Sequence, residues 1–183
     1  MSAPDTFEHL LLAPRIHASA FIAAGCAIIG DVEIGARSSI WFNCVLRGDV
    51  QRIFVGAGTN IQDGSVVHCS TGGRSTVIGD AVSVGHGAIL HSCTIEDTGF
   101  VGFGARVLDG ATIRRGGMLA AGGVLTPNKI IGVGELWAGT PAKLLRKMES
   151  NEQSALSAVA ERYMALALAY QNGGAENIRY KEK

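Results

Sequence analysis

Aliphatic residues recur every six positions along most of this chain. The series begins at Ile16, runs without a gap to Leu46, and after short offsets continues to Trp137. An amphipathic helix repeats every 3.6 residues and a strand every two, so neither explains a sustained period of six. The period predicts a parallel β-helix in which each hexad is a short strand and a turn, and three hexads make one triangular coil. An amphipathic β-sandwich is the alternative.

Residues three hexads apart should therefore stack, about 4.8 Å from one another along the coil axis. Leu46 should lie beneath Val67, with a three-residue insertion near 48–53, and Val67 beneath Leu90, with a five-residue loop within 68–76. Each residue then has a place on a grid, which we call the lattice, defined by its coil and by its position within the hexad. Residues that flank the stacked aliphatics form columns on the outer faces of this lattice.

The period ends after Pro141, where the spacing of apolar residues becomes helical. We expect one domain over 1–183, with a β-helix at 12–140, a helix at 148–172 and a frayed tail at 173–183. Ser150 and Gln153 suggest a capping box for the helix. Its predicted buried face consists of Leu156, Val159, Ala160, Tyr163, Leu166 and Ala167.

The amino-acid composition limits which kinds of molecule the protein is expected to bind. Sixteen basic and sixteen acidic residues give the 183-residue chain a formal net charge of zero, which argues against binding to nucleic acid or an anionic membrane. No stretch approaches the roughly 20 apolar residues of a membrane span, and the acidic N-terminus does not resemble a secretory signal. The four cysteines include no CxxC pair and are expected to be reduced thiols, so we expect a cytoplasmic protein.

The lattice places the titratable residues in two columns. Arg47, His68 and His91 each follow a stacked aliphatic and should form one column. His86 lies two positions after its aliphatic, above Asp63, on a different face. A corner of the coil separates His86 from the other two histidines within one chain.

A symmetric oligomer would bring the two columns together. In a closed ring of three chains, His68 and His91 of one chain would face His86 of the next, and Arg47 would face the next chain's Asp63. Three neutral imidazoles suit a metal such as zinc. The competing interpretation is a hydrogen-bonded histidine cluster without metal; His9 and His17 lie outside the columns and are expected at the surface.

The motifs that carry these residues resemble one family. The runs LRGDVQRIFVGAGTNIQDGSVVHCS, VGHGAILHSCTIED and VGFGARVLDGA are similar to the gamma-class carbonic anhydrases, over about residues 12–170. The resemblance implies a left-handed hexapeptide β-helix and a homotrimer. It implies Zn²⁺, or alternatively Fe²⁺ or another divalent metal, held by His68, His86 and His91. It also implies catalytic roles for Gln62, Asn60 and Tyr163, and interface salt bridges by Arg47, Asp49 and Asp63.

That family hydrates CO2 to bicarbonate through hydroxide on the metal, whose bound water has a pKa of about 7. The best-studied members of that family carry a Glu directly after the RxD motif and an acidic loop beyond the first histidine, and these carboxylates move the product proton. Here Val50 follows Asp49, and the loop reads CSTGGRS. We therefore expect weak CO2 hydration despite an intact metal site.

Two other functions fit the same fold. Hexapeptide β-helices also host acyltransferases that use coenzyme A, and a thioesterase acting on a CoA thioester is a close variant. The third possibility is a non-catalytic assembly subunit that keeps the site as a scaffold.

Overall fold

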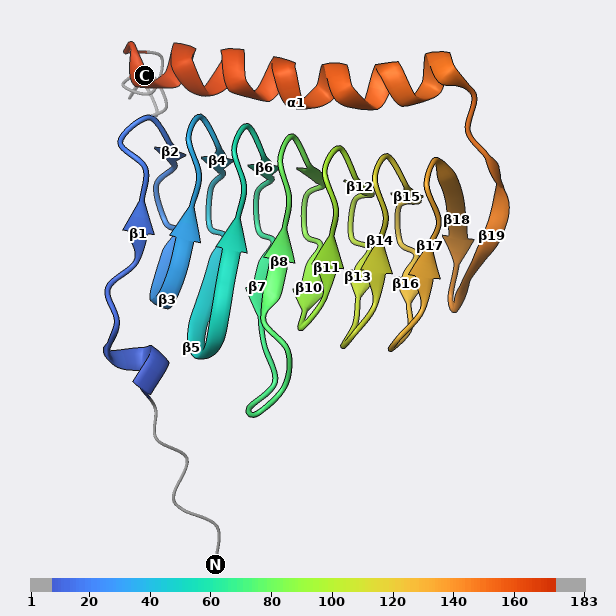
Figure 1. Cartoon of the computed structure of the whole chain (residues 1–183). Helices are drawn as coiled ribbons and strands as arrows, with labels where there is room; N and C mark the ends of the chain where they lie inside the picture. Colours follow the sequence, from blue (N-terminus) through green and yellow to red (C-terminus); the bar gives the residue numbers. More distant parts are fainter. Residues whose placement is uncertain (1–7, 174–183) are drawn as a thin grey trace, which may run out of the picture.

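The chain winds into a triangular coil with one long helix along its side (Figure 1). This computed structural model describes residues 8–173. Nearly all of the tail that we expected to fray, 173–183, lies outside the described residues.

Short strands make up the coil, preceded by a 3-10 helix, η1 (Glu8–Leu11), and followed by α1 (Ser150–Gln171). The strands are β1 (Arg15–Ile16), β2 (Phe21–Ile22), β3 (Ala27–Ile34), β4 (Ser39–Ile40), β5 (Val45–Val55), β6 (Asn60–Ile61), β7 (Val66–His68), β8 (Thr76–Ile78), β9 (Ser83–Val84), β10 (Ile89–His91), β11 (Thr94–Ile95), β12 (Phe100–Val101), β13 (Arg106–Val107), β14 (Thr112–Ile113), β15 (Met118–Leu119), β16 (Val124–Leu125), β17 (Ile130–Ile131), β18 (Glu135–Gly139) and β19 (Ala142–Lys147).

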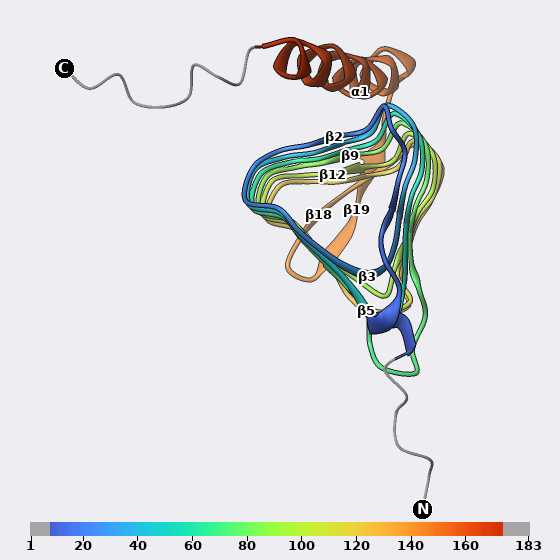
Figure 2. The ribbon, with the colours of Figure 1, turned by 90° about the vertical axis from the view of Figure 1, so that its left-hand side faces the viewer.

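Parallel pairing between successive coils builds the faces of the triangle. One face contains β2, β4, β6, β9, β12, β15 and β18 in that spatial order. The other two faces form one sheet, because the long strands β3 and β5 continue around the corner between them. Viewed from the N-terminal end, the chain turns anticlockwise as it recedes, so the β-helix is left-handed, as the resemblance implied (Figure 2).

The six-residue period determines which residues pair between successive coils. Leu46 pairs with Val67, and Val67 pairs with Leu90, as the lattice predicted. The predicted insertion is a bulge in β5, because Gly30 pairs with Gly48 while Val32 pairs with Ile53. The stacked aliphatics from Ile34 to Ile131 are at most 1% exposed and form the core, so burial of this column stabilises every coil.

One corner of the triangle needs a left-handed backbone conformation on every coil. The residues at this corner all have positive φ: Gly25, Asn43, Gly64, Gly87, Gly104 and Gly122. Glycine and asparagine are the residues that adopt this conformation at least cost, which explains why small residues punctuate the sequence. Asp63 and His86 come directly before two of these glycines, so both side chains lie at this corner.

Helix α1 lies where the sequence predicted it, but its details differ from the prediction. Its capping box consists of Glu149 and Glu152 instead of Ser150 and Gln153, since the helix begins one residue earlier than that pair requires. Ala160 and Ala167 are its buried residues, whereas Leu166 is exposed. The helix contacts β2, β4, β6 and β9, and small residues allow this close approach to the coil.

The segment after Pro141 contains a strand that the period did not predict. β19 runs antiparallel to β18 and covers that end of the coil before the chain turns into α1. Among residues 8–173, no helix is long and apolar enough to cross a membrane.

All four cysteines are free thiols, as expected. Burial raises the pKa of Cys44 to about 11 and that of Cys93 to about 12. Burial also raises the pKa of the Cys69 thiol and of the half-buried Cys26 thiol.

We predict that Cys44, Cys69 and Cys93 resist a thiol-specific reagent near pH 8 in the native protein, while Cys26 reacts slowly. A raised pKa lowers the fraction of reactive thiolate, so labelling should accelerate with rising pH. Absorbance of the released chromophore measures this, and denatured protein, in which all four thiols react, provides the control. Fast labelling of several native thiols would contradict the packing described here.

Candidate metal centre

His68 and His91 are cross-strand neighbours on one face of the coil. His68 ends β7, His91 ends β10, and the two residues are directly paired in the parallel register. His68 Nδ1 lies 3.3 Å from His91 Nε2, and the ring centroids are 5.3 Å apart. The spacing of 23 residues in the sequence therefore becomes a direct contact, as the lattice predicted.

Each of these two rings is held by its own carboxylate. Asp49 Oδ1 lies 2.9 Å from His68 Nε2, and Asp109 Oδ1 lies 2.7 Å from His91 Nδ1. If each imidazole donates a hydrogen bond from its N–H to its carboxylate, the remaining nitrogens, His68 Nδ1 and His91 Nε2, keep their lone pairs. Two lone pairs then face each other across 3.3 Å, and a cation between them removes the repulsion.

This separation fits two ligands of one metal ion. Two nitrogens at about 2.0–2.1 Å from a tetrahedral zinc lie roughly 3.3–3.4 Å apart. His68 and His91 therefore fit a metal without rearrangement of the strands.

His86 lies on another face. It follows β9, which belongs to the sheet containing β6 and β12, whereas β7 and β10 belong to the other sheet. His86 Nδ1 lies 2.8 Å from Asp63 Oδ2, one coil below, so the predicted column of Asp63 and His86 is present. The imidazole is 48% exposed, and its other neighbour is the ring of Phe103, with centroids 5.2 Å apart.

A single chain thus brings two of the three predicted histidines together and keeps the third apart. Within residues 8–173, no group of three or more His, Cys, Asp or Glu side chains is arranged to hold a metal. The predicted set of His68, His86 and His91 could be completed only by a second chain.

Asn60 and Gln62 form a buried polar pair on the β6 segment. Gln62 Nε2 donates to Asn60 Oδ1 at 3.0 Å, and Asn60 Nδ2 donates to Ser83 Oγ at 2.8 Å. These bonds leave Gln62 Oε1 as a buried acceptor without a partner among the described residues. A buried carbonyl oxygen in this state suits a hydrogen-bond donor that binds from outside the chain.

Tyr163, on α1, packs against the ring of Trp41, with centroids 5.3 Å apart in an edge-on geometry. The buried part of this cluster consists of Phe21, Ala23, Trp41 and Ala167, and Tyr170 flanks it. Burial, and then the negative charge of Asp63, raise the pKa of the Tyr163 hydroxyl. Tyr163 therefore lies on the Asp63 side of the molecule, within an aromatic cluster.

The predicted salt-bridge residues make contacts within their own chain. Arg47 Nη1 donates to Asp49 Oδ2 at 2.6 Å, and its second nitrogen lies 3.4 Å from His68 Nδ1. Burial raises the pKa of Asp49, but the hydrogen bonds from Arg47 and His68 outweigh it, and the pKa is lowered overall. Asp63 pairs with His86, as described above. No contact between Arg47 and Asp63 is found among the contacts of this single chain.

Asp109 and Ser70 are the polar residues at this centre that the sequence analysis did not identify. Ser70 Oγ donates to Asp109 Oδ2 at 2.5 Å, and this bond, together with that from His91, lowers the pKa of Asp109 against a smaller effect of burial. Asp109 comes two positions after Val107, which pairs with Leu90. The histidine column itself continues to Leu108, so Asp109 lies one position beyond it and the column rule did not point to it.

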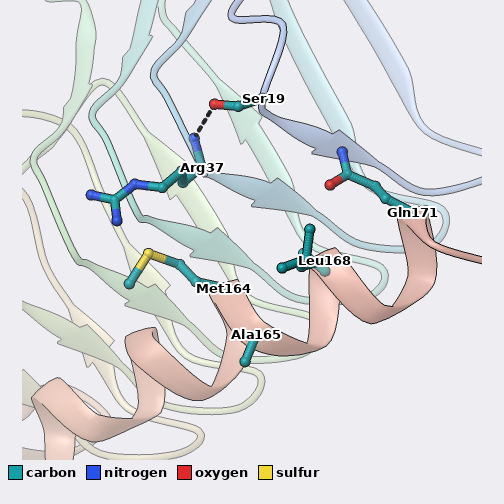
Figure 3. Close-up of a pocket in the computed structure, with 7 residues that line it drawn as sticks. Ser19, Arg37, Met164, Ala165, Leu168 and Gln171 are labelled. Carbon is teal, nitrogen blue, oxygen red and sulfur yellow. Dashed lines mark hydrogen bonds between the residues drawn. The ribbon is translucent and has the colours of Figure 1, made fainter.

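A separate pocket of about 290 Å³ lies between α1 and the first coils (Figure 3). Its lining includes Ser19, Arg37, Met164, Leu168 and Gln171, none of which belongs to the predicted site. The Arg37 backbone N–H donates to Ser19 Oγ at 3.1 Å (Figure 3).

Comparison with known proteins first defines the class. The hexapeptide-repeat family described as "Bacterial transferase hexapeptide (six repeats)" matches residues 13–48. The crystal structure of a hexapeptide transferase family protein from Anaplasma phagocytophilum is 52% identical, covers 86% of this chain and 92% of that chain, and has a TM-score of 0.83. The fold is therefore that of a hexapeptide-repeat β-helix protein.

Two curated relatives define the family more narrowly. "Gamma carbonic anhydrase 1, mitochondrial" of Arabidopsis thaliana is 47% identical over 172 residues, which are 91% of this chain but only 62% of that relative. "Probable carbonic anhydrase" of Methanocaldococcus jannaschii is 45% identical over 146 residues, which are 80% of this chain and 91% of that relative. The chain belongs to the gamma-class carbonic anhydrase family. The chain spans less than two thirds of the plant relative, whose name places that protein in mitochondria, so a cytoplasmic location stays a prediction.

Proposed function

We propose that this protein hydrates CO2 to bicarbonate at divalent metal sites that are shared between neighbouring chains of a homotrimer. The observation that carries the proposal is the pair of imidazole nitrogens, His68 Nδ1 and His91 Nε2, that face each other 3.3 Å apart. Each ring is oriented by a separate aspartate, so the pair is preorganised for a cation.

The position of His86 supports the shared site. Two different surface patches must meet to complete the histidine set, and a closed ring joins such patches once per chain. Apolar side chains accompany both half-sites: Val66, two residues before His68, is 37% exposed, and Phe103, stacked against His86, is 56% exposed. Burial of these side chains against a second copy would favour assembly.

Three neutral imidazoles suit Zn²⁺ and also Fe²⁺ or another divalent ion. When bound, such an ion lowers the pKa of a coordinated water to about 7, which makes hydroxide available to add to CO2 at neutral pH. His68, His86 and His91 would hold the ion. Arg47, Asp49 and Asp63 would orient these rings and contribute to the contact between chains.

Gln62 would orient the reacting hydroxyl. Its amide nitrogen is occupied by Asn60, so its free oxygen can only accept a hydrogen bond. Asn60 fixes this orientation through Ser83. Tyr163, on α1, would contribute to the same catalytic site.

Removal of the product proton would limit the rate. Val50 is half-buried against the core at the position where the resemblance to the gamma class leads us to expect a Glu, and the 69–75 loop contains no acidic residue. Hydration releases one proton per turnover, so buffer or solvent would have to accept it. We therefore propose an intact metal site with weak activity.

Acyl transfer to or from coenzyme A, or hydrolysis of a CoA thioester, is the second candidate. The transferase names of the matching family and of the Anaplasma structure favour it. An acyltransferase needs a histidine base but no convergent histidine set, and the paired nitrogens of His68 and His91 therefore argue for the first candidate. A non-catalytic assembly subunit would retain metal binding without turnover.

The metal site can be tested by elemental analysis and light scattering of the purified full-length protein. We predict a trimer with about one zinc or iron per chain. His86→Ala should lose most of the metal, while His17→Ala should retain it, because His17 bonds only Ser19 on the exposed surface. A monomer, or a metal-free trimer that binds coenzyme A, would reject the proposal.

The weak activity can be tested by stopped-flow CO2 hydration. We predict slow turnover that rises with buffer concentration, because an external base must take up the proton. Thr71→Glu, which places a carboxylate in the loop three residues after His68, should raise turnover at low buffer and reduce the dependence on buffer. Fast wild-type turnover that is insensitive to buffer would contradict the role assigned to the missing carboxylates.

A further inference from the structure

His91 has a carboxylate partner on the C-terminal side of the coil. The aspartates that contact His68 and His86 come from earlier in the chain, Asp49 and Asp63. Asp109 instead follows β13, one coil beyond His91, and its Oδ1 lies 2.7 Å from His91 Nδ1.

Both oxygens of this carboxylate are engaged. Oδ2 accepts a hydrogen bond from Ser70 Oγ at 2.5 Å, while Oδ1 faces His91. The Asp109 backbone is also anchored, because its carbonyl accepts from the backbone N–H of Asn128 at 2.9 Å. The carboxylate therefore has one defined orientation.

Ser70 is itself held in place. Its backbone N–H donates to Ser92 Oγ at 2.8 Å, and Ser92 is the residue after His91. The first part of the 69–75 loop is thereby tied to the coils that carry His91 and Asp109.

We propose that Asp109, oriented by Ser70, is a positioning residue that fixes the ring of His91 for metal binding. This inference rests on the proposed metal site. By accepting a hydrogen bond from the Nδ1–H, Asp109 selects the tautomer whose Nε2 lone pair points at His68 Nδ1. It also restrains rotation of the ring. The 69–75 loop, through Ser70, is part of the support of the metal site.

Zinc affinity of the full-length protein tests the proposal. Competition with a chromogenic chelator should show about 10–100-fold weaker binding for Asp109→Ala, the typical effect of removing such a partner. Asp109→Asn keeps an oxygen acceptor and should lose less, and Ser70→Ala should lose less than Asp109→Ala. Asp97→Ala is the matched control, since Asp97 is similarly exposed and pairs with Arg115 away from the histidines. Wild-type affinity in Asp109→Ala would overturn the proposal.

The tautomer of His91 provides a readout that does not require metal. Nitrogen-15 NMR of the histidine rings in the metal-free protein should show the proton on Nδ1 of His91 in wild type and in Asp109→Asn. In Asp109→Ala it should shift toward Nε2. An unchanged tautomer in Asp109→Ala would overturn the positioning role. If wild type binds no zinc and yet shows this shift, the positioning role stands and the proposed function fails.

Discussion

Each hexapeptide repeat pairs in parallel with the repeat three positions later in the series, one coil further along the axis. The rest of the structure depends on this pairing. Each pairing buries an aliphatic between the aliphatics of the coils above and below, as Val67 lies between Leu46 and Leu90. The same register places the outward residues in columns. A shift of one residue in any coil would therefore expose the core and separate His68 from His91.

The chemistry follows from where the columns lie relative to the corners. The corner turns require positive φ on each coil, so His86 can precede Gly87 at a corner while His68 and His91 occupy a flat face. His68 Nδ1 and His91 Nε2 face each other because Asp49 and Asp109 hold the opposite ring nitrogens within hydrogen-bond distance. Each of two surfaces carries part of the proposed histidine set, and assembly of identical chains is the proposed means of joining the two parts.

Much of the fold and of the candidate site could be predicted from the sequence, because residues that are three hexads apart in the sequence are neighbours in space. The period located the core, both insertions, the contact between His68 and His91, and the placement of His86 above Asp63. Details that depend on side-chain orientation or on contacts with the ends of the coil were missed. Ser70 reaches Asp109 only because the 69–75 loop folds back on the next coil, and no period governs a loop. The strand β19 depends on the open edge of β18, which a repeat pattern cannot describe.

The helix was predicted in position but not in detail. The residues that it buries against the coil are small, Ala160 and Ala167, while Leu166 is left exposed. Its cap depends on which residue first adopts helical geometry, and that residue follows from the β19 connection. Local propensity alone therefore placed the capping box one residue too late.

Metal binding by mixed trimers is the most direct test of the central claim that each site is shared between two chains. One chain type would carry His86→Ala, and the other would carry His68→Ala together with His91→Ala, each with a different affinity tag. Neither chain alone should bind zinc, whereas co-assembled trimers isolated through both tags should contain one intact site each, because only one junction in such a ring pairs the complementary faces. Zinc retained by either parent trimer, or absent from the mixed trimers, would contradict a site shared between chains.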